Sequence, residues 1–214
     1  DNIFRFAQAG YELGTLMNII PSEGGYQATL TSEVASLHER LASTAKAAIT
    51  AIEAIYVPAD DITDQAIQTV FPYLDSNVIL SRSIYQEGRF PAVDLLTSTS
   101  AALTTEVVGE LHFNTLLKAQ NLLKKAVTLE RIVQLVGESE LSTDDELIYK
   151  RSKTLNNYMT QSFLVTEAQS GRPGAKVPLK STVEDVAAIL DGKYDEYPPE
   201  TFLYIATLRE AISK

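Results

Sequence analysis

The sequence has 214 residues, of which 45% are hydrophobic, so the chain can bury a sizeable core in one large domain or two small ones. Its formal net charge of -10 argues against a general nucleic-acid surface, because phosphate binding requires clustered Lys and Arg side chains. Cysteine is absent, which excludes disulfides and thiolate metal sites. No apolar run of about 18 residues is present, so no membrane span is expected, and no signal-peptide leader is visible.

The first half of the chain alternates helical patterns with apolar runs. Apolar residues recur at helical spacing over residues 2–20 and again over residues 31–45. The run "AITAIEAIYVPADD" (48–61) is almost wholly apolar, as strands buried on both faces are. A further apolar segment is "NVILSRSIYQEG" (77–88). Helices that alternate with buried strands predict a parallel α/β sheet. Two strands are too few to complete such a sheet, so a preceding segment is expected to be missing.

From about residue 104 the pattern is helical. Helical spacing predicts a helix over residues 116–136, which Gly137 closes. Ser142 followed by Asp145 approximates a capping box for a helix that reaches about residue 161. We therefore predict an α/β portion over residues 1–103 and a mostly helical domain over residues 104–214.

Two further helices are predicted near the end of the chain. Ser181 and Glu184 fit the capping box and are expected to start one of them. Pro199 stands at a tolerated first-turn position and is expected to open a last helix through Ile212.

Chemistry-bearing motifs are scarce. No G-x-x-x-x-G-K-[ST] loop occurs, so the sequence contains no such phosphate cradle of backbone N–H groups. No Ser-His-Asp or Cys-His set is indicated either. By themselves these general patterns indicate only an α/β portion followed by helices.

Five stretches are more specific: they are "DNIFRFAQAG", "IPSEGGYQATL", "AIYVPADDITD", "GRFPAVDLLTSTS" and "GKYDEYP", in this order. Together they resemble the β subunit of the F-type ATP synthase, from its Walker B aspartate to near its C-terminus. The resemblance implies the second half of a RecA-like P-loop nucleotide-binding domain, with a parallel sheet that is incomplete in this chain. An all-α C-terminal domain would follow it.

The resemblance places two catalytic residues at the start of the chain. Asp1 matches the Walker B aspartate, which helps to hold Mg²⁺ directly or through water. Arg5 matches an arginine that reaches the terminal phosphate and stabilises the charge of the transferred phosphoryl group. Without the resemblance, Asp1 would be read as a helix N-cap and Arg5 as a surface ion-pair partner. Tyr56 matches a tyrosine near the phosphates, or else is an aromatic residue at a strand end. Arg82 of "LSR" also matches a family position, but the match does not decide whether it has a direct nucleotide-site role.

The expected adenine pocket combines two stretches. Phe90 of "GRFPAVD" matches the aromatic residue that stacks on adenine, and Phe163 of "QSFLVTEAQSG" is the retained aromatic residue of the second stretch. Thr166 stands where the family has alanine, and Gln169 where it has a second phenylalanine. The Gln169 difference removes a stacking face, which is worth about 0.5–1.5 kcal/mol for an aromatic pair. A divergent working pocket and a weakened pocket both remain open.

Other departures fall on positions that face neighbouring subunits in the family. The family's "DSTSR" and "HYE" are "TSTSA" and "HFN" here, which gives Ala101 and Phe113. The acidic stalk-contacting loop appears as "SELSTDD". Its expected stalk contacts are Glu140, Leu141, Asp144 and Asp145. A solvated acidic loop is the alternative, since most such charge runs are solvated.

The resemblance implies a β-type catalytic subunit that binds MgATP or MgADP and couples ATP synthesis or hydrolysis to rotation. Its implied partners are α-type subunits in an alternating hexameric ring and a γ-type central stalk. The complex would be a peripheral sector at a membrane, facing the cytoplasm, mitochondrial matrix or plastid stroma. Without a phosphate loop, residues 1–214 alone are not expected to hydrolyse ATP. The alternatives are a divergent paralogue with a mainly structural or non-proton-coupled motor role, and a non-enzymatic interaction module.

Overall fold

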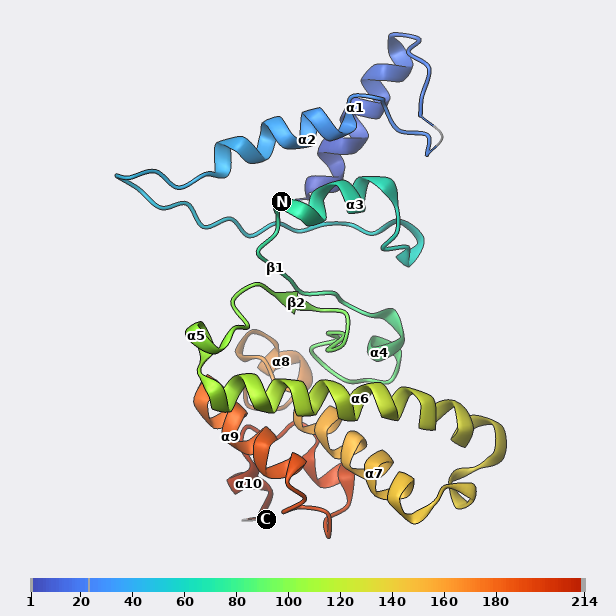
Figure 1. Cartoon of the computed structure of the whole chain (residues 1–214), viewed down its shortest axis with the longest axis vertical. Coiled ribbons are helices and arrows are strands. Elements are labelled where there is room, and N and C mark those ends of the chain that lie inside the picture. Colours follow the sequence, from blue (N-terminus) through green and yellow to red (C-terminus); the bar gives the residue numbers. More distant parts are fainter. Residues whose placement is uncertain (1, 23, 213–214) are drawn as a thin grey trace. The chain divides into compact units, whose positions relative to one another are not determined.

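The computed structural model describes residues 2–22 and 24–212, and the chain divides into two compact units, Asp1–Asp75 and Ser76–Lys214. We call them the N-terminal unit and the C-terminal unit and describe each by itself (Figure 1). The N-terminal unit contains α1 (Ile3–Leu16), α2 (Leu30–His38) and α3 (Gln65–Val70), with the 3₁₀ turns η1 (Glu39–Leu41), η2 (Pro58–Asp60) and η3 (Phe71–Tyr73).

Helix α1 begins at a side-chain cap. The Asn2 side chain accepts a hydrogen bond from the Phe4 N–H at 3.1 Å, as a helix N-cap does. The helices of the unit pack around one small apolar core, whose buried members are Ala7, Leu30, Val34, Ala66 and Val70. The helix predicted over residues 2–20 is confirmed and ends at Leu16. The second predicted helix is shorter than expected, since α2 ends at His38 and only the turn η1 continues it.

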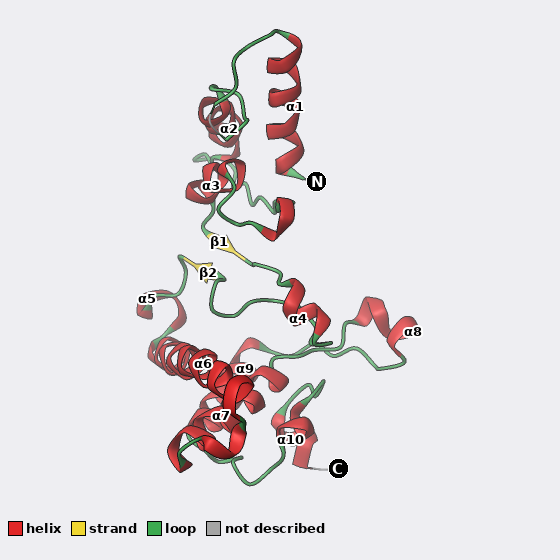
Figure 2. Ribbon diagram, turned by 90° about the vertical axis from the view of Figure 1, so that its right-hand side faces the viewer, coloured by secondary structure: helices red, strands yellow, loops and turns green. Residues whose placement is uncertain are grey.

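The strand predicted over residues 48–61 is wrong for the described structure. Residues 42–57, between the 3₁₀ turns η1 and η2, form neither helix nor strand, and Figure 2 shows no strand between α2 and α3. Ile52 is 96% exposed, so the apolar character of the segment is not matched by burial. The described residues offer it no partner strand, and a strand requires a neighbour to satisfy its backbone N–H and C=O groups.

The C-terminal unit begins with a small sheet. Strands β1 (Ser76–Asn77) and β2 (Thr99–Ser100) pair antiparallel, with Ser76 opposite Ser100. A parallel sheet is therefore not what the described residues form. The second predicted strand, residues 77–88, is also mostly wrong, because β1 ends at Asn77 and α4 (Arg82–Gln86) follows after the N-cap Ser81.

The rest of the unit is helical (Figure 1). Its elements are α5 (Thr105–Val108), α6 (Glu110–Val136), η4 (Glu138–Glu140), α7 (Thr143–Tyr158), η5 (Leu164–Thr166), α8 (Glu167–Ser170), α9 (Leu179–Leu190), η6 (Pro199–Phe202) and α10 (Leu208–Ile212). The helix predicted over 116–136 is confirmed as part of α6, and Gly137 ends it with a φ of 97°. The Ser142 cap is confirmed too, since its side chain accepts from the Asp145 N–H at 3.2 Å.

Two predictions for the last 35 residues are wrong in detail. Helix α9 starts at Leu179 after Pro178, so Ser181 lies inside the helix instead of capping it. The helix predicted from Pro199 through Ile212 is broken into η6 and α10. The residues between these two elements leave the helical conformation, and Tyr204 adopts a φ of 56°.

The core of the C-terminal unit lies among α6, α7, α9 and the segment that follows η6. Its fully buried members include Leu155, Ile189, Phe202 and Leu208, each at most 1% exposed. The mixed α/β class with a helical C-terminal part is therefore confirmed. The boundary predicted at residues 103 and 104 stays a prediction. No helix within residues 2–22 and 24–212 has the length and apolarity to cross a bilayer.

Candidate functional site

The start of α1 is fastened to the segment that carries Tyr56. The Asn2 side-chain oxygen Oδ1 accepts from the Tyr56 N–H at 3.2 Å as well as from the Phe4 N–H at 3.1 Å. The Ile3 N–H donates to the Ala54 carbonyl at 2.9 Å. The Phe4 and Tyr56 rings lie 5.7 Å apart, centroid to centroid. The first turn of α1, which carries Arg5, and Tyr56 are thereby held beside each other.

Arg5 is exposed, and a neighbour on its own helix orients it. Its Nη1 donates to the Gln8 Oε1 at 2.7 Å, three residues along α1. A guanidinium held in this way keeps donors for an anionic ligand, because it has five N–H groups in all. Asp1, the other predicted catalytic residue, lies outside the described residues.

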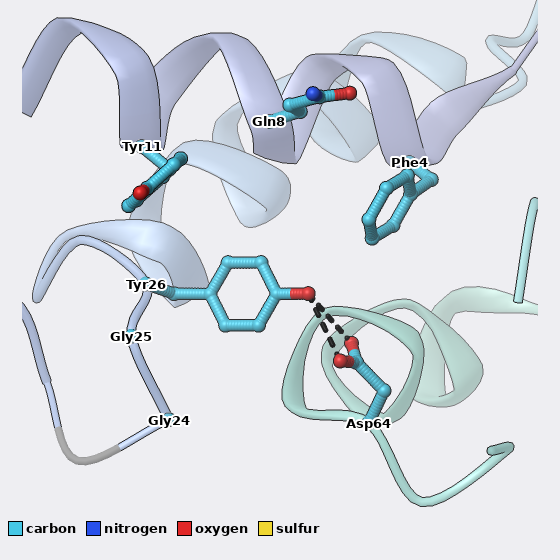
Figure 3. A pocket seen from close by; sticks show the side chains of 7 residues that line it. All are labelled: Phe4, Gln8, Tyr11, Gly24, Gly25, Tyr26 and Asp64. Atoms are coloured by element: carbon cyan, nitrogen blue, oxygen red, sulfur yellow. Dashed lines mark hydrogen bonds between the residues drawn. The ribbon is translucent and has the colours of Figure 1, made fainter. Parts of the chain in front are cut away.

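A cavity of about 350 Å³ borders the same helix (Figure 3). Its lining residues are Phe4, Gln8, Tyr11, Gly24, Gly25, Tyr26 and Asp64. The Tyr26 hydroxyl donates to the Asp64 carboxylate, with both oxygens at 2.9 Å. Burial, together with this hydrogen bond and the Asp64 charge, raises the pKa of Tyr26 to about 12. Tyr26 is therefore a neutral hydrogen-bond donor at physiological pH.

The side chains that the structure describes do not form a ligand set for Mg²⁺. Within residues 2–22 and 24–212, no group of three or more His, Cys, Asp or Glu side chains is arranged to hold a metal ion. The predicted Mg²⁺ contact therefore depends on Asp1.

A second group of predicted site residues comes together in the C-terminal unit. The Gln161 N–H donates to the Phe90 carbonyl at 2.8 Å, which joins the two stretches expected to contact adenine. The loop between Gln161 and Ala175 is closed on itself. The Ala175 N–H donates to the Ser162 carbonyl at 3.1 Å, and the Gln161 side-chain amide donates to the Ala175 carbonyl.

The rings in this group are accessible. Phe90 is 36% exposed and Phe163 is 39% exposed, and Phe90 also meets the edge of Tyr85 with centroids 5.4 Å apart. Thr166 turns its hydroxyl back to the Phe163 carbonyl at 3.2 Å, and Gln169 lies exposed on α8. Exposed aromatic faces beside small and polar side chains can stack on a planar base.

The predicted stalk contacts lie at the turn between α6 and α7. Glu140 and Asp144 are exposed, whereas Leu141 and Asp145 are half-buried. Asp145 also serves the local structure, because the Ser142 hydroxyl donates to its carboxylate at 2.7 Å. The exposed carboxylates are free of helix-capping bonds and so remain accessible to a basic partner.

Two models of known protein families match consecutive parts of the chain. Residues 1–100 match the model of the ATP synthase alpha/beta family, nucleotide-binding domain. Residues 101–198 match the model of the C-terminal domain of V and A type ATP synthase. Together the two models cover residues 1–198, and both describe parts of ATP synthase subunits. The chain therefore combines part of an ATP synthase nucleotide-binding domain with a C-terminal domain of the V and A type.

A solved structure supports this assignment. The chain is similar to the structure titled a unique ATP synthase subunit NeqB from Nanoarcheaum equitans, with a TM-score of 0.73 and 25% sequence identity. The match covers 92% of this chain and 46% of that one, so this chain spans about half the length of that subunit. These matches support the family, but not the F-type β subunit in particular.

Sequence reasoning missed the residues that organise each group. Asn2, Gln8 and Tyr26 had no assigned role, although Gln8 lies three residues from Arg5 and Asn2 stands at a helix start. Both spacings are readable signals. Tyr26 and Tyr204 could not be found in this way, because their partners are distant in the sequence.

Proposed function

We propose that this chain is part of a divergent nucleotide-binding subunit of a rotary ATP synthase or ATPase, with a C-terminal domain of the V and A type. The observation that carries the proposal is the consecutive match of both domain models over residues 1–198. Joining of the Phe90 and Phe163 stretches through the Gln161–Phe90 hydrogen bond supports it.

Each unit carries its own group of residues with a proposed nucleotide-binding role, and the two groups are separate proposals. Arg5, held by Gln8, is proposed to contact phosphate oxygens. The bond from the Tyr56 N–H to Asn2 Oδ1 keeps Tyr56 beside the same turn of α1, which supports a place for Tyr56 near those oxygens. Phe90 and Phe163 offer ring faces to the base, and Thr166 and Gln169 form the altered edge of that pocket. Binding would be electrostatic at the phosphates and dispersive at the base. Catalysis would consist of positioning and charge stabilisation during phosphoryl transfer.

The partners in this proposal are other ATP synthase subunits. A ring of α-like neighbours and a central stalk are the assembly that the resemblance implies, with the turn between α6 and α7 as the stalk contact. A β-type catalytic role of the F-type kind is the narrower proposal. A mainly structural or regulatory subunit is the alternative, and the loss of an aromatic face at Gln169 favours it.

The test is nucleotide binding and turnover by the subunit in its assembled complex. A fluorescent ADP analogue is expected to bind, and Phe163→Leu is expected to weaken it about 3- to 10-fold, since one stacking contact is lost. Val165→Ala is the matched control, because Val165 is 90% exposed on the same turn.

Turnover then separates the two roles. Arg40, an exposed arginine of η1, supplies the control variant. ATP hydrolysis that disappears in Arg5→Ala but persists in Arg40→Ala supports the catalytic role. Nucleotide binding without turnover supports the structural or regulatory role. A complex whose nucleotide binding is indifferent to both Phe163→Leu and Arg5→Ala contradicts the proposal that this chain contributes to a nucleotide site.

A further inference from the structure

Tyr204 has an unusual backbone conformation. It lies where the sequence predicts a continuous helix, yet its φ is 56°, in the left-handed region that few residues other than glycine adopt. Such a conformation persists only where the surrounding structure holds it. The Tyr204 N–H donates to the Thr160 hydroxyl at 2.7 Å, and this hydroxyl in turn donates to the Asn157 carbonyl at 2.6 Å. Thr160 is 4% exposed, so the turn is anchored to the buried end of α7.

The side chain of Tyr204 reaches the first stretch of the proposed base pocket. Its hydroxyl donates to the carbonyl of Gly88, two residues before Phe90. Gly88 also ends the turn after α4 with a φ of 73°. The bond therefore fixes the backbone from which Phe90 projects.

The same ring contacts the second stretch. The Arg172 guanidinium carbon lies 4.1 Å from the centroid of the Tyr204 ring. Arg172 belongs to the closed loop 161–175, which carries Phe163, Thr166 and Gln169. A guanidinium over an aromatic face contributes about 0.5–1 kcal/mol at exposed sites, so the contact is attractive but modest.

These contacts border open space. A cavity of about 550 Å³ lies beside them, with Arg172, Gly174, Glu200 and Tyr204 among its lining residues. The two stretches are therefore held here by a hydrogen bond and a cation–π contact beside a cavity, and not by dense packing alone. Polar contacts of this kind can be broken and re-formed when a ligand changes the separation of the stretches.

We propose that Tyr204 is a positioning residue for base binding, which sets the separation of the Gly88–Phe90 stretch and the 161–175 loop. It also connects both stretches to the segment between η6 and α10, so that occupation of the base pocket changes the restraint on this segment. The inference rests on the proposed function, because it assumes that Phe90 and Phe163 contact the base. Tyr204 itself lies outside the motifs that carry the family resemblance.

The test compares two ligands in the assembled subunit. Tyr204→Phe keeps the ring and removes the hydroxyl. It is expected to weaken binding of an ADP analogue about 3- to 10-fold, because one hydrogen bond is lost. Binding of inorganic tripolyphosphate is expected to be unchanged. Arg172→Gln is expected to act in the same direction by about 2- to 3-fold. Tyr197→Phe is the matched control, a tyrosine that is 37% exposed outside the pocket.

Hydrogen exchange supplies a readout that a merely structural role would not move. In the wild type, ADP is expected to slow exchange of the Gln161 amide, which donates to Phe90, and of the Tyr204 amide. In Tyr204→Phe, ADP is expected to slow exchange of the Gln161 backbone amide but not of the backbone amide at position 204. Thermal unfolding is expected to be the same for Tyr204→Phe and Tyr197→Phe.

Three outcomes overturn the inference, and they are distinguishable. If Phe163→Leu weakens ADP binding but Tyr204→Phe does not, the inference is wrong and the proposed function stands. If Tyr204→Phe weakens tripolyphosphate as much as ADP and lowers the melting temperature, its role is structural only. If neither Phe163→Leu nor Tyr204→Phe affects ADP binding, the base pocket itself is wrong, and the inference fails with it.

Discussion

The phenolic oxygen of Tyr26 lies 2.9 Å from each carboxylate oxygen of Asp64. Asp64 is also the N-cap of α3, because it accepts from the Ala66 N–H at 2.9 Å. The Asp64 carboxylate therefore caps α3 and also holds Tyr26, in the loop before α2. The pair forms one wall of the cavity beside α1 (Figure 3).

The Tyr26–Asp64 pair predicts a loss of stability at alkaline pH. The pKa of Tyr26 is raised from 10.0 to about 12, first by burial and then by the Asp64 hydrogen bond and charge. The folded state therefore favours the neutral phenol, so this contribution is complete below pH 10 and is lost as the pH rises through 12. Urea unfolding of wild type and Tyr26→Phe at pH 8 and pH 11 is expected to show a smaller alkaline loss in the variant.

Asp64→Asn is the matched variant for the same pair. Asparagine is an equally good N-cap, so α3 is expected to remain folded. Removal of the charge is expected to lower the pKa of Tyr26 only part of the way toward 10, because burial is the larger cause. An ultraviolet difference titration against Tyr26→Phe measures this pKa. An unchanged pKa would show that the carboxylate has no part in the shift.

Replacement of the α1 cap is predicted to loosen two elements together. Asn2→Ala removes the acceptor for the Phe4 and Tyr56 N–H groups and is expected to cost about 1–2 kcal/mol of unfolding free energy. Asn2→Asp keeps an acceptor and is expected to cost far less. Hydrogen exchange at Tyr56 gives the second measurement. Fast exchange at Phe4 with unchanged exchange at Tyr56 would contradict the shared anchor.

Phe202 is predicted to be the most sensitive apolar side chain of the C-terminal unit. It is 0% exposed and meets the edges of Tyr194 and Tyr197 at centroid distances of 6.0 and 6.3 Å. Phe202→Ala is expected to lower the unfolding free energy by about 3–5 kcal/mol, since a large cavity is left. Leu203→Ala is the control, because Leu203 is 40% exposed. Equal costs for the two variants in urea unfolding would contradict this core.

Gly174 is predicted to tolerate no side chain. A Cβ placed there lies 2.5 Å from the backbone N and Cα of Leu164, so Gly174→Ala must displace the turn that follows Phe163. The expected cost is about 1–3 kcal/mol in unfolding free energy, together with weaker nucleotide binding. Lys176→Ala, an exposed neighbour, is the control. If Gly174→Ala matches the control in both measurements, the close approach of the two segments is not required.

Local patterns accounted for the helices. The periodicity of residues 2–20 and 116–136 and the cap at Ser142 act within a few residues of the chain, so they could be read directly. The strand predicted at 48–61 was wrong because a strand depends on a partner that local patterns do not reveal. An apolar extended run becomes a strand only when another strand satisfies its backbone, and the described residues supply none.

The candidate site divides in the same way. Arg5, Phe90 and Phe163 could be assigned from sequence motifs, because a resemblance carries residue identities along the chain. Their supports could not be assigned, because each bond spans many residues. Tyr56 meets Asn2 across 54 positions, and Tyr204 meets Gly88 across 116.

The ATP synthase resemblance, the helical C-terminal part and the residue types offered to a nucleotide could be predicted from the sequence, since motifs and periodicity are properties of the chain. The break of the last predicted helix at Tyr204, and the contacts by which this side chain joins two distant stretches, appear only in the folded molecule. A tyrosine in the left-handed region is unfavourable by itself, so local sequence patterns do not predict it. Tyr204 is held by hydrogen bonds to Thr160 and Gly88, and folding alone brings these residues within reach.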